Sequence, residues 1–304
     1  MLVLLAVIWG GSVPLTKLGL RSFSPLTLTA LRYLVAAPCF AAMLRGRPLP
    51  PPRAVAQSAG LGPLGIVVGQ LAQTLGVADT SASVATVISA LIPVLVVVFG
   101  AARLHQPLGG RQALGLAVAF VGVALVATGD PRRLAEFTAL AGAGRLRGDL
   151  LMGLSAVAVA LYYVLSVPLV ARYSVVTIAA LTSLAGAAGL APVAWWDLRR
   201  APAHPTALGV LIVLYLALFV TVFGMWVWFG ALSRLPVRIA AALQYLQPLV
   251  GVGASAALFG DVLGAWFWAG TGLVLVGIAA TASARRGATP TGVSGPGPRP
   301  AGVP

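Results

Sequence analysis

Uncharged polar side chains recur at helical spacing inside long apolar stretches of this sequence. Gln70, Gln73 and Thr74 share one face of a helix, because side chains three and four positions apart are neighbours there. In hydrocarbon, such amide and hydroxyl groups need hydrogen-bond partners or water. This face therefore either packs against another helix or lines a wet cavity.

Four further apolar stretches contain polar or aromatic side chains of the same kind. They hold Thr86, Ser89 and Pro93; Tyr162, Tyr163 and Ser166; Trp226 and Trp228; and Gln244, Tyr245 and Gln247. If these faces converge, they enclose a cavity of amide, hydroxyl and indole groups without a fixed charge. Such a cavity suits a neutral or zwitterionic solute with an apolar or aromatic portion. The alternative is that these groups form helix–helix hydrogen bonds and interfacial aromatic belts.

We expect the solute to contact eleven residues of these stretches and of the first apolar stretch. They are Trp9, Ser12, Gln70, Gln73, Ser89, Tyr162, Ser166, Trp228, Gln244, Tyr245 and Gln247. No metal-ligand spacing, phosphate-binding loop or nucleophile motif accompanies them. We therefore expect no metal, no cofactor and no catalytic residue.

Charged side chains are scarce in the middle of the apolar stretches, where a charge costs roughly 2.5–3.5 kcal/mol on insertion scales. Arg32 lies near enough to a helix end for its guanidinium to reach the membrane surface, so it is either an interfacial anchor or a gating residue that holds an anionic group. Lys17 is expected to be an anchor of the same kind. Asp261 lies at the membrane edge, and we assign it with Arg32 to coupling or gating.

Two pairs of prolines occupy equivalent positions in the chain. Pro14 and Pro168 are 154 residues apart, and Pro93 and Pro248 are 155 residues apart. Each proline removes a backbone hydrogen bond and can kink its helix. We expect these kinks to act as hinges between two open states; inherited helix packing is the alternative explanation.

The elements that hold these residues must be membrane-spanning helices. Of the 304 residues, 59% are hydrophobic and only 9% are charged, with a mean hydropathy of +0.98; a soluble domain has about 25% charged residues. The net charge of +14 comes from short basic clusters between apolar runs, which is typical of topology signals and not of a nucleic-acid-binding surface. A single cysteine, Cys39, excludes an internal disulfide.

One sequence skeleton occurs twice. Pro93, Gln106, Gly115 and Gly122 match Pro248, Asp261, Gly270 and Gly277. With roughly 20 apolar residues per span, the chain divides into ten spans, five in each copy, the third lying at 59–78 after a loop at 45–58. We therefore predict an all-α polytopic membrane protein. Residues 1–128 form the first five-helix repeat, 129–148 a linker loop, 149–283 the second repeat and 284–304 a disordered tail.

An odd number of spans per copy inverts the second copy relative to the first, so the two repeats are expected to enclose a central cavity. Eleven basic residues fall on one side of this topology and eight on the other. The positive-inside rule then places both termini in the cytoplasm. We expect the protein in the cytoplasmic (inner) membrane.

Three features form a recognisable set. They are Trp9 with Gly10, Leu31 with Arg32 and Tyr33, and the repeated pattern of a proline, an acidic residue thirteen positions later, and glycines nine and sixteen positions beyond it. Over roughly residues 1–283 the chain thereby resembles the EamA family of the drug/metabolite transporter superfamily. Gln106 departs from the family pattern, which has an acid there. The resemblance implies a secondary transporter, often an exporter of amino acids or related metabolites, with a cavity between its halves.

We therefore predict a transporter, not an enzyme, that moves a small organic solute outward by alternating access. Its expected partners are a small-molecule substrate and the lipid bilayer, without nucleic acid, and it is expected to be a monomer or a homodimer. One alternative is a phosphorylated-sugar or nucleotide-sugar carrier of the same superfamily, which needs Lys or Arg in the cavity. Another is a non-transporting membrane scaffold, for which a large soluble loop or tail is expected.

Overall fold

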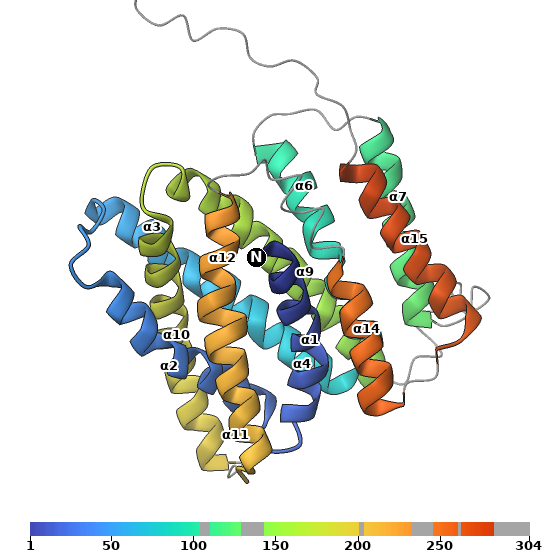
Figure 1. Ribbon diagram of the computed structural model, residues 1–304, viewed down its shortest axis with the longest axis horizontal. Coiled ribbons are helices and arrows are strands. Elements are labelled where there is room, and N and C mark those ends of the chain that lie inside the picture. Colours follow the sequence, from blue (N-terminus) through green and yellow to red (C-terminus); the bar gives the residue numbers. More distant parts are fainter. Residues whose placement is uncertain (104–109, 129–142, 201–203, 233–245, 261–262, 283–304) are drawn as a thin grey trace, which may run out of the picture.

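A computed structural model of the protein describes residues 1–103, 110–128, 143–200, 204–232, 246–260 and 263–282. These residues form helices and no strand (Figure 1). Six helical stretches are long and apolar enough to cross a membrane: Pro25–Leu44, Pro52–Asp79, Ala82–Arg103, Arg145–Val170, Val175–Arg200 and Ala207–Gly230. Four shorter apolar helices cover Val3–Gly19, Ala113–Gly122, Val250–Phe259 and Ala265–Gly277. The protein is therefore a polytopic membrane protein.

The first half of the chain contains five helical stretches, two of them interrupted. They are α1 (Leu2–Gly19); α2 (Pro25–Leu44); α3 (Pro52–Gly62), η1 (Pro63–Val68) and α4 (Gly69–Asp79); α5 (Ala82–Ser89) and α6 (Leu91–Arg103); and α7 (Gly110–Thr128). The third stretch begins at Pro52, seven residues earlier than expected, so the loop expected at 45–58 is shorter. Proline suits the first turn of a helix, and Ala54 and Ser58 are buried there.

The second half repeats this order. Its helices are α9 (Ala143–Val170); α10 (Val175–Arg200); α11 (Ala207–Leu214), η3 (Tyr215–Phe223) and α12 (Gly224–Leu232); α14 (Leu246–Phe259); and α15 (Ala265–Ala282). Residues 143–148, assigned to the linker from the sequence, form the first turns of α9. The rest of that linker and the tail at 284–304 lie outside the described residues.

Both halves contain a π-helical segment at the same place. A shift of 155 residues maps η1 (Pro63–Val68) onto the last six residues of η3 (Tyr215–Phe223). In η3 the Thr221 hydroxyl donates a hydrogen bond to the Leu216 carbonyl, five residues earlier, at 2.8 Å. Short π-helical segments inside α-helices often occur at functional sites.

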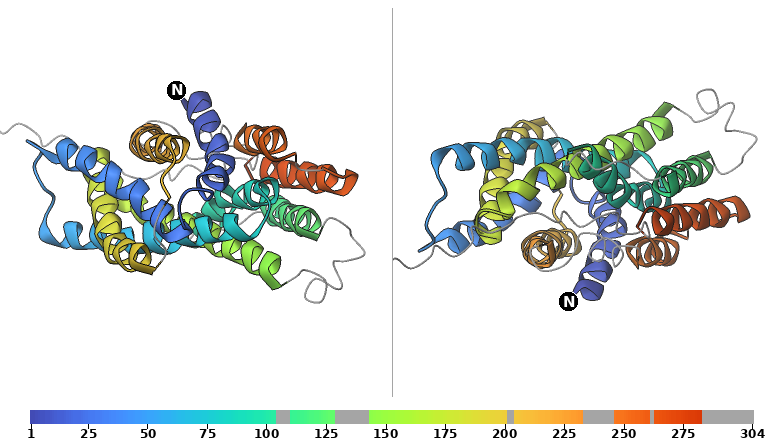
Figure 2. Two further views of the ribbon diagram at one scale, coloured as in Figure 1. Left: turned by 90° about the horizontal axis from the view of Figure 1, so that it is seen from below. Right: turned by 90° about the horizontal axis from the view of Figure 1, so that it is seen from above.

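The repeated glycines bring α7 and α15 together, and the two helices lie side by side (Figures 1 and 2). A Cβ built on Gly122 would lie 2.6 Å from the carbonyl oxygen of Gly270, and one built on Gly277 would lie 2.4 Å from that of Gly115. Only glycine therefore allows the two backbones to approach this closely.

The first helix of each half packs mainly against the other half. Helix α1 contacts α14, α12 and α11, whereas α9 contacts α4, α6 and α5. Helices α2 and α10 pack against each other. Helices α12 and α14 both pack on α1, and α4 and α6 both pack on α9. We call these the α1–α12–α14 and α4–α6–α9 groups, each drawn from both halves of the chain.

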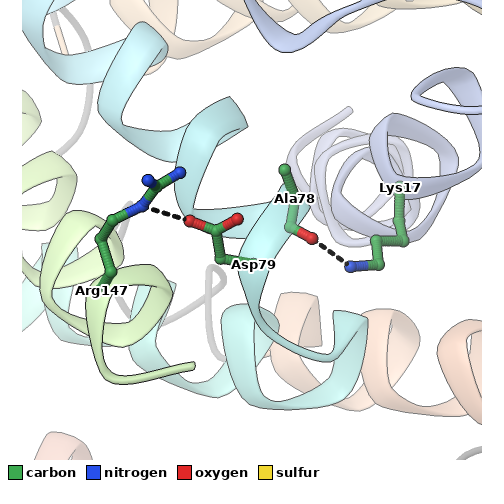
Figure 3. A network of polar contacts seen from close by, with 4 residues as sticks. All are labelled: Lys17, Ala78, Asp79 and Arg147. Carbon is green, nitrogen blue, oxygen red and sulfur yellow. Dashed lines mark hydrogen bonds and ion pairs between the residues drawn. The ribbon is translucent and has the colours of Figure 1, made fainter. Parts of the chain in front are cut away.

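Several helix ends meet where α1 ends, and we call this the Lys17 end of the molecule. Lys17 itself is not the membrane anchor expected from the sequence. Its ammonium group donates hydrogen bonds to the carbonyl oxygens of Val77, Ala78 and Thr80, at 2.7, 3.0 and 2.8 Å. These carbonyls close the C-terminus of α4, where the helix dipole favours a cation. Next to them Arg147 Nε, from the start of α9, donates to Asp79 Oδ2 at 2.7 Å (Figure 3).

A buried carboxylate caps α2 at the same end. Asp197, from the end of α10, is 7% exposed. It accepts hydrogen bonds from the Thr27 amide at 3.2 Å, from the Thr27 hydroxyl at 2.6 Å and from the Ser24 hydroxyl. The first turn of a helix presents unpaired N–H groups and favours negative charge, so Asp197 fixes α10 against the N-terminus of α2.

Asp197→Ala is expected to destabilise the protein by about 2–3 kcal/mol, because hydrogen bonds to a charged group contribute about 1.5–3 kcal/mol and the buried Thr27 hydroxyl would lose its acceptor, although the Thr27 amide keeps the Ser24 hydroxyl. Thermal unfolding in detergent measures the effect. Asp79→Ala is the matched control: its Arg147 partner has a 65% exposed side chain, and exposed ion pairs contribute about 0–1 kcal/mol. Equal losses in the two variants would contradict the capping role of Asp197.

Candidate functional site

A cavity lies between the two halves of the chain. It contains about 1260 Å³ of space that no protein atom fills, part of it open to solvent. In the described part of the chain its lining comes from α1, α2, η1, α4, α5, α6, α9, η3, α12 and α14. Both π-helical segments contribute, with Gly65 and Ile66 from η1 and Val220 and Thr221 from η3.

The cavity brings together eight of the eleven residues expected to bind a solute. They are Trp9, Ser12, Gln70, Gln73, Ser89, Tyr162, Trp228 and Gln247. Ser166 is not among the lining residues; it is buried and its hydroxyl donates to the Tyr162 carbonyl at 2.7 Å. Gln244 and Tyr245 lie outside the described residues.

The four prolines expected to be hinges lie in different surroundings. Pro248 lines the cavity, whereas Pro14 is buried inside α1 and Pro168 is exposed near the end of α9. Pro93 lies in α6, four residues after Ser89, where α5 ends. Because proline has no N–H, it cannot donate the helical hydrogen bond to the carbonyl of the residue four positions earlier, which here is Ser89. Asp261, expected to couple or gate, is outside the described residues.

Arg32 lines the cavity, which corrects the expectation of a cavity without a fixed charge. Its Nε donates to Thr221 Oγ1 at 2.6 Å, its Nη1 donates to Gln70 Oε1 at 3.0 Å, and its guanidinium lies 5.4 Å from the centre of the Tyr33 ring. The side chain therefore does not extend to the membrane surface as an anchor. It ties α2 to α4 and to η3, and it supplies the cavity with a cation.

Four aromatic side chains, which we call the aromatic cluster, line another part of the cavity. Trp228 lies 5.8 Å from Trp9 and 5.7 Å from Tyr163 between ring centres, and Tyr163 lies 5.4 Å from Tyr162. The indole of Trp9 donates to the Val220 carbonyl at 2.9 Å. Trp228 is buried, and its Nε1 has no hydrogen-bond partner among the described residues. The cluster offers an apolar surface to which this indole adds an N–H donor.

Equivalent positions of the two copies contribute opposite chemistry to the cavity. Gln73 and Trp228 are 155 residues apart in the chain, and both line it. The same spacing relates Gln70 to Met225. It also relates Ile92 to Gln247, where the apolar residue belongs to the first copy and the amide to the second. The first copy thus supplies most of the amides, and α12 of the second supplies a thioether and an indole.

Thr86 and Tyr163, expected on polar faces but not among the solute contacts, also line the cavity. Sequence reasoning missed three further lining residues, Tyr33, Thr221 and Met225. Tyr33 stands next to Arg32 in the sequence, and nothing in the sequence pointed to Thr221 or Met225.

Comparisons with known proteins find transporters that are similar along most of this chain. An uncharacterized transporter of Archaeoglobus fulgidus is 25% identical over 283 residues, which cover 91% of this chain and 95% of the relative. A probable terminal-alkyne amino-acid exporter of Streptantibioticus cattleyicolor is 28% identical over 86% of this chain and 85% of its own. The uncharacterized inner membrane transporter YedA of Escherichia coli is 24% identical over 90% of this chain and 87% of its own.

One solved crystal structure shares the fold, with a TM-score of 0.65 and 19% identity over 92% of this chain and 94% of that chain. The model of the EamA-like transporter family matches residues 1–128 and 146–283, which leaves out mainly the segment between the two halves and the end of the chain. With a family match on both halves and curated transporters similar along most of its length, the chain belongs to the EamA-like transporter family.

Proposed function

We propose that the protein is a secondary transporter that moves a small organic solute, an amino acid or a related metabolite, outward across the cytoplasmic membrane by alternating access. The observation that carries this proposal is the cavity between the halves, lined by equivalent positions of both copies. Transporters with repeated halves bind their solute at such an interface. Membership in a transporter family supports transport, and the similarity to a probable amino-acid exporter supports the solute class.

The proposed architecture is ten membrane-spanning helices in two inverted five-helix repeats, residues 1–128 and 149–283, joined by the 129–148 linker. Six long and four shorter apolar helices support the number. The inversion is supported by the contacts of α4: its C-terminus binds Lys17 near the end of α1 and Arg147 near the start of α9. The end of α1 and the start of α9 thus lie at the same end of the molecule, as expected for the first helices of two inverted copies.

The proposed setting is the inner membrane, with both termini in the cytoplasm and the Lys17 end on the other side. The bilayer and the solute are the proposed partners, without nucleic acid, and the protein works as a monomer or a homodimer. We propose Gln73 and Trp228 as solute contacts, because they occupy the same repeat position and both line the cavity.

Purified protein in liposomes is expected to exchange radiolabelled amino acids or related organic solutes with saturable kinetics. Trp228→Ala is expected to reduce this exchange by up to about tenfold, because an aromatic contact contributes about 0.5–1.5 kcal/mol and about 1.4 kcal/mol corresponds to a factor of ten. Gln73→Ala should also reduce the exchange, because Gln73 lines the same cavity.

The matched control is Trp226→Ala on the same helix, since Trp226 is 47% exposed and is not among the lining residues. Its exchange should equal that of the unaltered protein. The absence of saturable exchange for any amino acid, amine or organic metabolite would contradict the transport proposal. Equal exchange in all variants would contradict the solute contacts.

A further inference from the structure

We infer that Arg32, with Gln70 and Thr221, forms a binding site for the carboxylate of the solute, and that the cavity takes amphipathic monocarboxylates whether or not they carry an amino group. This inference rests on the proposed function, because it names the substrate class of the same cavity. The aromatic cluster would hold the apolar part of the solute.

The charge of Arg32 is the first support. The acidic residues in the described part of the chain are Asp79, Asp149 and Asp197, and none of them lines the cavity. The other three acids, Asp130, Glu136 and Asp261, lie outside the described residues. The hydrogen bonds of Arg32 go to a neutral hydroxyl and a neutral amide. Among the described residues no carboxylate faces this half-buried cation, and an unpaired charge inside a membrane protein is unfavourable, so an anionic solute would be stabilised beside it.

The hydrogen-bond donors at this point are the second support. A guanidinium group has five N–H donors and no acceptor, and two of those donors face Thr221 and Gln70. Since Arg32 can only donate, Gln70 must present its oxygen to it, and the NH₂ of Gln70 is left for another group. The remaining N–H groups of Arg32 and Gln70 match the two oxygens of a carboxylate, which prefers charge-assisted and bidentate contacts.

The serine and threonine hydroxyl groups of the lining do not offer their protons to a solute. Ser12, Thr86 and Ser89 donate to backbone carbonyls of their own helices at 2.6, 2.7 and 2.9 Å, and Thr221 donates to Leu216. An ammonium group would therefore meet only neutral oxygens there, and it would share a low-dielectric cavity with the Arg32 cation. The amino group of an amino acid should contribute little to binding.

The position of the aromatic cluster restricts the shape of the solute that fits the cavity. Trp9, Trp228 and Tyr163 present ring surfaces to the same cavity that holds Arg32. A solute with a carboxylate at one end and an aromatic or branched apolar group at the other satisfies both parts of the lining. A phosphate ester is a poorer match, because a dianion would keep one charge without a partner.

Five probes that share a phenyl ring separate these possibilities. Binding to the purified protein is measured by calorimetry for 3-phenylpropanoate, phenylalanine, phenethylamine, 3-phenylpropanamide and phenyl phosphate, and each is also tested in liposome exchange. We expect the two carboxylates to bind with similar affinity and the amine, the amide and the phosphate at least tenfold more weakly.

Two variants test the role of Arg32. Arg32→Gln removes the charge, and Gln70→Glu leaves Arg32 in place but supplies a carboxylate next to it. Both should weaken binding of 3-phenylpropanoate at least tenfold and change binding of the neutral amide by less than twofold. Arg32→Lys should restore part of the carboxylate affinity. Because Gln70→Glu retains the guanidinium and its contacts, the test stands even if Arg32→Gln does not fold.

The results distinguish this inference from the transport proposal. Carboxylate binding that is unchanged in Gln70→Glu, tighter binding of phenethylamine than of 3-phenylpropanoate, or tighter binding of phenyl phosphate would overturn the carboxylate site while transport remained supported by exchange of those solutes. Absence of binding and exchange for all probes, together with absence of exchange for other organic solutes, would overturn both.

Discussion

Gly277→Leu is expected to leave little folded protein in detergent extracts. A Cβ at this position would lie 2.4 Å from the Gly115 carbonyl oxygen and 2.5 Å from the Ala119 backbone nitrogen, both on α7. Backbone atoms cannot move away by a change of rotamer, so α7 and α15 would have to separate along their whole contact. Overpacking costs about 1–3 kcal/mol and occasionally more, and a leucine adds three carbons beyond the Cβ that already clashes.

The matched control is Gly272→Leu, on the same helix. Gly272 is exposed, and a Cβ built there meets no atom within 4 Å. Fluorescence-detected gel filtration measures the amount of monodisperse protein, and heating the extract measures its unfolding temperature. We expect Gly272→Leu to match the unaltered protein in both. Similar yields and unfolding temperatures for the two leucine variants would disprove the tight contact of α7 with α15.

The same glycines show which part of the fold could be predicted from the sequence alone. Their repetition 155 residues apart predicted that the chain is duplicated. It did not predict that Gly122 lies on Gly270 and Gly277 on Gly115. Spacing along a helix states which residues share a face, but the partner of that face depends on how the two copies are placed relative to each other.

Arg32 illustrates the limit for the site. Its distance from a helix end was readable, and that distance allowed its side chain to reach the membrane surface. The direction in which it extends is set by Gln70 and Thr221, which lie 38 and 189 residues away. The faces of Gln70 with Gln73 and of Thr86 with Ser89 were predictable, because helical spacing is local; the neighbour that gives the cavity its charge was not.

The π-helical segments had no sequence signal at all. Residues Pro63–Val68 and Tyr215–Phe223 are as apolar as ordinary spanning helices, so their composition does not mark the wider turn. In η3 the Thr221 hydroxyl accepts a hydrogen bond from Arg32 and donates one to the Leu216 carbonyl, five residues earlier. The irregular backbone and the cavity cation are therefore held by the same side chain.

Lys17→Met is expected to open the cavity from the Lys17 end. The lysine belongs to the α1–α12–α14 group of helices, and the carbonyls that it binds belong to α4, in the α4–α6–α9 group. Figure 3 shows the ammonium group on one side of the end of α4 and the Asp79–Arg147 ion pair on the other. If the two groups separate during transport, these three hydrogen bonds must break.

The size of the effect follows from the charge of the lysine. Hydrogen bonds to charged groups contribute about 1.5–3 kcal/mol, so their loss would shift a two-state equilibrium about 10- to 150-fold toward the state open at this end. A cysteine placed in the cavity reports this state. Ser12→Cys lines it, and Cys39→Ala removes the native thiol. The rate at which a membrane-impermeant thiol reagent labels the cysteine from outside the cell should rise at least tenfold in Lys17→Met.

Arg21→Met is the matched control, since Arg21 is an exposed cation at the same end whose guanidinium lies 5.9 Å from the centre of the Phe259 ring. Its labelling rate should be unchanged. Labelling that stays equally slow in a folded Lys17→Met protein would mean that the lysine is only a static cap of α4. The separation of the two helix groups would then have to occur elsewhere, because a contact that is broken in one of two exchanging states must shift their populations when it is removed.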